Sequence, residues 1–80
     1  MDFEVLVQLK GEVLDPEGRA IQETLKSQGI HGVTHVAVAK RYVLSMAEDT
    51  PGQGETLART IAETYLANPV AQTFQVRRIP

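Results

Sequence analysis

The chain has 80 residues, with 10 acidic against 8 basic side chains and no cysteine or tryptophan. We expect one domain over residues 1–80, and a chain this short buries only about 60% of its unfolded surface, which leaves little room for a walled active-site cleft. The lack of cysteine excludes disulfides, thiolate metal sites and a thiol nucleophile. An apolar share of 42% argues against disorder. These limits favour a binding module or a small subunit.

The charge and hydropathy patterns bear on the classes of partner. No apolar run approaches the roughly 20 residues that cross a membrane, and acidic Asp2 and Glu4 stand where a signal peptide would be positive, so we expect a cytoplasmic protein with no membrane partner. The net charge is slightly acidic, and the sequence lacks the basic patch that is typical of nucleic-acid-binding proteins. Residues 24–47 contain no acid, only Lys26, Lys40 and Arg41. This separation either steers an acidic partner or is plain solvated surface.

The first half of the sequence predicts a strand followed by a helix. Residues 3–9 alternate between apolar and other side chains, which is typical of a strand with one buried face. Asp15-Pro16 is typical of a helix start, and Gly29 predicts its end. Gly18, inside the first turn, costs about 1 kcal/mol relative to alanine, so we expect a close backbone approach there.

The second half predicts two strands, a helix and a last strand. Val36 and Val38 share one strand face, and Tyr42, Leu44 and Met46 share another. The three residues between these strands leave room only for a tight hairpin with Lys40 and Arg41 at its tip. Residues 47–54 are typical of a loop. A helix with Leu57, Ile61 and Tyr65 on its buried face then precedes Asn68-Pro69 and a strand that contains Phe74 and Val76.

The order β-α-β-β-α-β predicts an α+β, ferredoxin-like two-layer sandwich with a four-stranded antiparallel sheet and both helices on one face. The other face would stay uncovered. Its predicted side chains are mildly apolar: Leu6, Gln8, His35, Ala37, Ala39, Val43, Thr73 and Gln75. A small domain without disulfides or metal often relies on association, so we expect this face to pack against a second copy or another subunit.

The sequence offers no complete catalytic or metal-binding set. His31 and His35 would lie about 13 Å apart on a strand, too far for one metal ion. Gly52-Gln53-Gly54 precedes a helix but does not complete a phosphate-binding pattern. Arg77 and Arg78 point to opposite faces of the last strand. We therefore expect no catalytic residue and no metal ligand on this chain.

Three motifs resemble the PurS family in order and spacing, and together they cover essentially the whole chain. They are LKGEVLDPEGRA at residues 9–20, VAVAK at residues 36–40 and LANPV at residues 66–70. The sequence departs from the family at Glu17, Ala37 and Ala39, where members often carry Gln, Arg and Gly. Ala39 argues against a turn that needs positive φ at that position.

The resemblance implies a non-catalytic small subunit of phosphoribosylformylglycinamidine synthase, an ATP- and glutamine-dependent C–N ligase complex of purine biosynthesis. In that family the subunit bridges a glutaminase (PurQ) and an ATP-dependent synthetase (PurL) and assists ammonia transfer to formylglycinamide ribonucleotide. It implies no cofactor on this chain, with ATP and Mg used by the complex, and self-association into a dimer or tetramer.

Partner contact is expected first at Lys40 and Arg41, and then, by motif match, at Lys10, Asp15, Pro16 and Gly18. For Asp15, Pro16 and Gly18 the alternative is a purely architectural role at the helix start. The alternative function is a ferredoxin-like regulatory module that binds a small metabolite, as ACT-like modules do.

Overall fold

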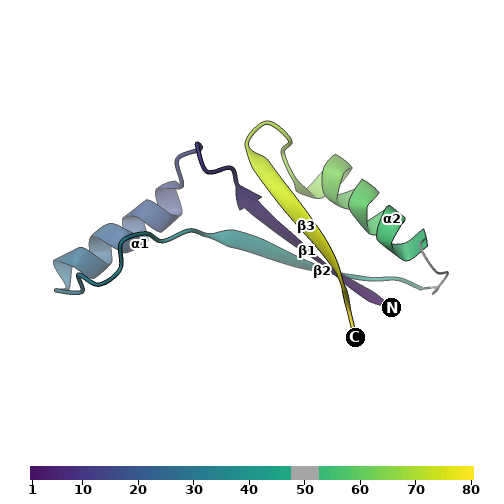
Figure 1. The fold of residues 1–80 in the computed structure, drawn as a ribbon, viewed down its shortest axis with the longest axis horizontal. Coiled ribbons are helices and arrows are strands. Elements are labelled where there is room, and N and C mark those ends of the chain that lie inside the picture. The colour runs from purple at the N-terminus through teal and green to yellow at the C-terminus, as the bar shows by residue number, and fades with distance from the viewer. Residues whose placement is uncertain (48–52) are drawn as a thin grey trace.

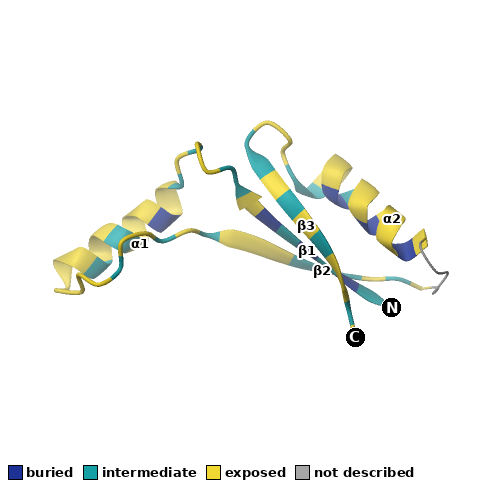
Figure 2. Ribbon diagram, in the orientation of Figure 1, coloured by how far each residue is buried: buried dark blue, intermediate teal, exposed yellow. Residues whose placement is uncertain are grey.

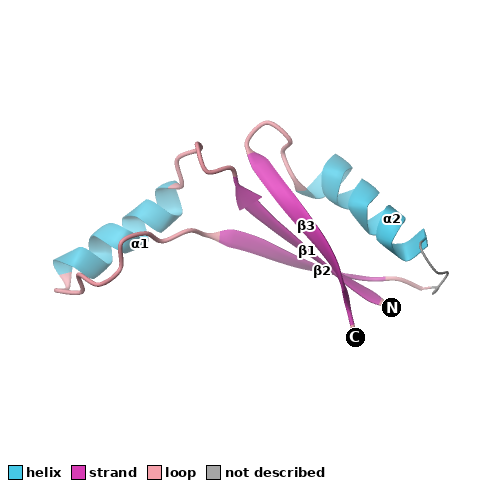
Figure 3. Ribbon diagram, viewed as in Figure 1, coloured by secondary structure: helices cyan, strands magenta, loops and turns pink. Residues whose placement is uncertain are grey.

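The computed structural model describes residues 1–47 and 53–80, which form an α+β fold of three strands and two helices (Figures 1 and 3). The elements are β1 (Asp2–Leu9), α1 (Pro16–Ser27), β2 (Ala39–Ser45), α2 (Gln53–Ile61), a π-helical turn η1 (Ala62–Leu66) and β3 (Gln72–Ile79). Most of the predicted loop at residues 47–54 lies outside the described residues. No helix in the described part of the chain is long and apolar enough to span a membrane.

The sheet is antiparallel in the order β2-β1-β3, with β1 in the centre. Val5 lies opposite both Tyr42 and Val76. Residues that oppose each other directly share a face, so the predicted alternation of β1 is confirmed. Phe3, Val5 and Val7 are buried on the face that α2 covers, as the dark segments of Figure 2 show.

Helix α2 packs on β1 and β3 through small residues. Gly54 and Ala58 are the buried positions of α2, and Ala62 is buried at the start of η1. A Cβ on Gly54 would lie 2.7 Å from the Phe3 ring. The buried face predicted for this helix was wrong at two positions, because the side chains of Leu57 and Tyr65 are exposed, at 51% and 78%. The π-helical turn explains Tyr65, since its wider winding rotates the following side chains and brings Leu66 onto the core instead.

The predicted hairpin at residues 39–41 is wrong. Residues 39–45 form one uninterrupted strand, so the described sheet has three strands and not four. Two-residue hairpin loops favour residues with positive φ, and in the described residues only Gly29 has one. Lys40 and Arg41 therefore lie along an edge strand and not at a hairpin tip.

Helix α1 does not join α2 on the sheet, so the prediction of both helices on one face is wrong for the single chain. Residues 33–38 run beside α1 and lead directly into β2, which carries the helix beyond the end of the sheet (Figure 1). We call residues 16–38 the arm. The molecule consequently measures 51 × 28 × 14 Å.

The two sides of the arm approach each other closely at Gly18. A Cβ there would overlap the Val36 carbonyl oxygen and lie 3.0 Å from Oδ2 of Asp15. The predicted close backbone approach is therefore confirmed.

We expect Gly18→Ala to lower the free energy of unfolding by about 1–3 kcal/mol, because the backbone on one side of the arm must shift. Gly11→Ala is the matched control, since no atom lies within 4 Å of its added Cβ, and its effect should stay within about 1 kcal/mol. Urea unfolding of both variants measures the difference. Equal midpoints would contradict the close approach.

Candidate functional site

The Asp15 carboxylate joins the two sides of the arm at the start of α1. Its Oδ1 accepts a hydrogen bond from the Gly18 amide at 2.9 Å, and its Oδ2 accepts one from the Val38 amide at 2.8 Å. Pro16 follows as the first helical residue, where its missing N–H costs nothing. One side chain therefore caps the helix and fixes a segment 23 residues further along the chain. We call this arrangement the Asp15 clamp.

The two amide donors also set the charge state of the clamp. The hydrogen bond from Gly18 lowers the pKa of Asp15 below its ordinary value, and the bond from Val38 adds to this, with a smaller contribution from His35. Both bonds favour the ionised form. The clamp therefore works as a carboxylate at neutral pH.

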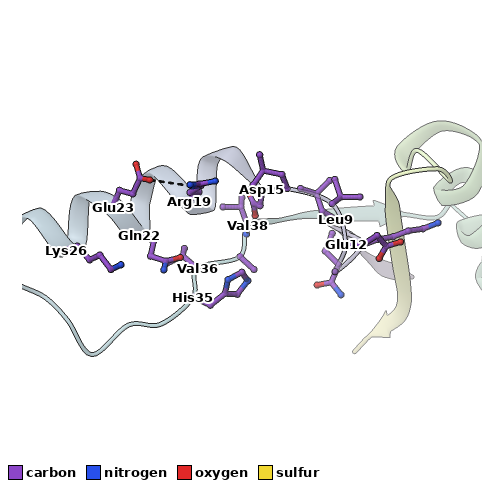
Figure 4. A pocket seen from close by; sticks show the side chains of 16 residues that line it. Leu9, Glu12, Asp15, Arg19, Gln22, Glu23, Lys26, His35, Val36 and Val38 are labelled. Carbon is purple, nitrogen blue, oxygen red and sulfur yellow. Dashed lines mark hydrogen bonds and ion pairs between the residues drawn. The ribbon is translucent and has the colours of Figure 1, made fainter.

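A groove of about 610 Å³ lies beside the clamp, between the 10–15 loop, α1 and residues 35–38 (Figure 4). Its wall carries charges of both signs, including Lys10, Glu12 and Lys26, and along α1 Arg19 pairs with Glu23 at 3.4 Å. Apolar side chains such as Val36 and Val38 also line it. This mixed lining does not select a ligand of one charge.

The sheet face opposite α2 carries a three-residue charge cluster that spans all three strands. Glu4 on β1 accepts hydrogen bonds from Nε of Arg41 on β2 and from Nε of Arg77 on β3, the latter at 3.1 Å. The hydrogen bond from Arg41 is the main cause of the lowered pKa of Glu4. Glu4 is only 15% exposed under the two arginines, which themselves remain exposed. The cluster thus holds two guanidinium groups at fixed positions on the uncovered face.

The structure brings some of the predicted site residues together and separates others. Lys10 and Asp15 line the same groove, next to the helix start formed by Pro16 and Gly18. Lys40 and Arg41 are exposed neighbours on β2, but strand alternation turns them to opposite faces.

Sequence analysis missed two interactions of the site: the hydrogen bond from the Val38 amide to Asp15 and the ion pair between Glu4 and Arg77. The Val38 amide on Asp15 is a backbone contact, and no residue type signals it. The sequence shows that Glu4 and Arg77 carry opposite charges, but their pairing depends on the β1–β3 register, in which they are directly opposed.

Neither histidine belongs to a metal-binding group in the described residues. His31 and His35 are both exposed. Within residues 1–47 and 53–80, no three histidine, cysteine, aspartate or glutamate side chains are grouped closely enough to hold a metal ion.

The fold and these surfaces define a small α+β domain that presents a clamped arm and an uncovered sheet face. A family model described as PurS, phosphoribosylformylglycinamidine (FGAM) synthase, matches residues 2–79. The chain is 38% identical over 74 residues to the synthase subunit PurS of Mycobacterium leprae, covering 92% of this chain and 90% of that protein. The chain belongs to the PurS family.

Solved structures agree with this assignment. The fold matches PurS of Bacillus subtilis with a TM-score of 0.83 at 32% identity, covering 95% of this chain and 94% of that one. It also matches a chain in the structure of PurLQS from Thermotoga maritima, with a TM-score of 0.86 at 24% identity, covering 98% and 95% of the two chains. At that lower identity the second match shows the shared fold.

The lowered pKa of Asp15 predicts a pH dependence of stability. Because the folded pKa lies below the ordinary value of 3.8, the carboxylate stabilises the fold above that pH and loses this contribution as the pH falls through the folded pKa. Asp15→Asn should therefore make the free energy of unfolding less dependent on pH between about pH 5 and pH 2. Urea unfolding across this range measures the slope. Glu12→Gln, at an exposed loop position, is the control, and an equal slope in both variants would argue against the charged clamp.

Proposed function

We propose that this chain is the non-catalytic small subunit of a phosphoribosylformylglycinamidine synthase, and that it holds a PurQ-type glutaminase and a PurL-type synthetase together. The observation that carries the proposal is membership of the PurS family over residues 2–79. A chain in PurLQS of Thermotoga maritima has the same fold, which supports the choice of partners. ATP and Mg would be bound by the synthetase, and the complex would work in the cytoplasm.

The proposed contribution to catalysis is the protection of ammonia. Ammonia released from glutamine is largely protonated at neutral pH and then no longer nucleophilic, so its transfer benefits from a path that excludes water. A subunit that seals the junction between glutaminase and synthetase provides such a path without a catalytic group of its own. The synthetase would activate the formamide oxygen with ATP, and ammonia would displace phosphate to give the amidine.

The predicted partner residues divide into two kinds under this proposal. Arg41 is the direct contact we favour on the uncovered face, because Glu4 fixes its guanidinium group while leaving it exposed. Lys40 and Lys10 offer further exposed or half-exposed cations. The clamp residues Asp15, Pro16 and Gly18 would act by positioning the arm. We also propose that the subunit self-associates, since much apolar surface is left open in one chain.

A regulatory module that binds a small metabolite is the alternative, and the groove beside the clamp is the observation in its favour. Isothermal titration of the isolated protein with amino acids and nucleotides separates the two functions. We expect no heat of binding. Saturable binding that Lys10→Ala abolishes would favour the alternative.

The synthase assay tests the proposal directly. Synthetase and glutaminase subunits from the same source should show strong glutamine-dependent activity only when this chain is added, and activity with ammonium salts should depend on it less. Product formation is followed with both nitrogen donors. Equal glutamine-dependent rates with and without the chain would overturn the bridging role.

Arg41→Ala should raise the concentration of this chain needed for half-maximal glutamine-dependent activity several-fold. Val43→Ala, at a neighbouring outward position on the same strand face, is the matched control, because it removes no charge. A half-maximal concentration for Arg41→Ala equal to that of the unsubstituted chain would exclude Arg41 as a partner contact.

A further inference from the structure

The charge cluster on the uncovered sheet face does not balance its own charge. The guanidinium groups of Arg41 and Arg77 share the single carboxylate of Glu4, so the cluster keeps one positive charge. The side chain of Glu4 is 15% exposed, whereas those of Arg41 and Arg77 are 53% and 70% exposed. The negative group therefore lies beneath the two positive ones, and the excess positive charge faces outwards.

The two guanidinium groups are held in place and still have hydrogen-bond donors to spare. Each donates its Nε hydrogen to Glu4, and Nη2 of Arg77 also lies 3.1 Å from Oε2 of Glu4. A guanidinium group has five N–H donors in a planar fork that fits a carboxylate through two parallel hydrogen bonds. The remaining Nη donors of Arg41 and Arg77 suit a second carboxylate. Their fixed positions lower the entropy cost of binding it.

We propose that Arg41 and Arg77 together bind the carboxylate of an aspartate or glutamate side chain on the protein that covers this sheet face. Glu4 is the positioning residue, because it lies on the central strand and holds one guanidinium group from each edge strand. This site rests on the proposed function, in which a synthase subunit is the partner. It adds the chemistry by which that partner is recognised.

The cost of burying the cluster determines what the partner must bring. A charged group that loses its water without gaining an opposite charge is strongly destabilising. A protein that covered Arg41 and Arg77 without an acidic group would bury one unpaired positive charge. Leu6 lies directly opposite Arg41 and is half-buried, so the surroundings are partly apolar. Charge pairs that form in such surroundings are stronger than pairs in water.

The charge of the whole chain favours a single carboxylate over a polyanion. The net charge is −2, and Asp2 lies two residues from Glu4 on the same strand face. A nucleic acid is held by many basic side chains along its backbone. On the uncovered face the positive excess is limited to two arginines, which matches one acidic side chain at short range.

Removal of one positive charge tests the site. Arg77→Gln should raise the dissociation constant for the synthase subunit that this chain binds by about tenfold, because one of two charged contacts is lost. Isothermal titration with the PurL-type and PurQ-type subunits, separately and together, measures the constant. Arg78→Gln is the matched control, since it removes the same charge one residue away on the opposite strand face, and it should leave the constant unchanged. Added salt should weaken binding of the unsubstituted chain more than binding of Arg77→Gln.

Arg77→Lys identifies the group that is bound. It keeps the positive charge without the planar fork, so it should recover part of the affinity that Arg77→Gln loses. It also places a primary amine at position 77, which a carbodiimide joins to a carboxylate in contact with it through an amide bond. Mass spectrometry of the crosslinked complex should find position 77 joined to an aspartate or glutamate of the partner. Arg78→Lys should give far less of this crosslink.

The outcomes separate the site from the proposed function. An unchanged dissociation constant for Arg77→Gln, with the unsubstituted chain still bound to a subunit, would overturn the site alone. If the unsubstituted chain bound neither subunit and left the glutamine-dependent rate unchanged, the proposed function would fail and the site with it. A change in the sedimentation of the Arg77→Gln chain by itself would place a second copy on this face and overturn the acidic partner. Circular dichroism checks that each variant is folded.

Discussion

The straight passage of the chain through residues 39–41 determines the rest of this structure. A turn at this point would fold residues 33–38 back against β2 and place α1 on the sheet. Without a turn, the same residues continue into the arm, and α1 lies beyond the sheet (Figure 1). The exposed side chains of α1, the thin core and the elongated shape all follow from the absence of a turn at residues 39–41. The Asp15 clamp then makes the arm a defined unit, because it ties the two sides of the arm together through two backbone amides.

Local patterns predicted most of the elements, because their signals reside in neighbouring residues. The predictions of the β1 alternation, the Asp15-Pro16 helix start and a left-handed Gly29 just after α1 were all correct. The hairpin was wrong because two adjacent strands and one long strand share the same period of two, and only the turn residues distinguish them. Ala39 already argued against the turn. The exposure of Tyr65 was not predictable by period alone, since a π-helical turn changes the period within the helix.

The residues of the Asp15 clamp were selected from the sequence, but their geometry was not predictable from it, and their role in partner contact stays a prediction. Motif resemblance selected Asp15, Pro16 and Gly18, and the structure gives them a mechanical reason, which is to hold the arm. The partner of Asp15 at Val38 is a backbone amide 23 residues away, so only tertiary structure reveals it. Arg41 was selected as a hairpin tip and lies instead on the sheet face, where Glu4 and Arg77 complete a cluster that depends on strand register.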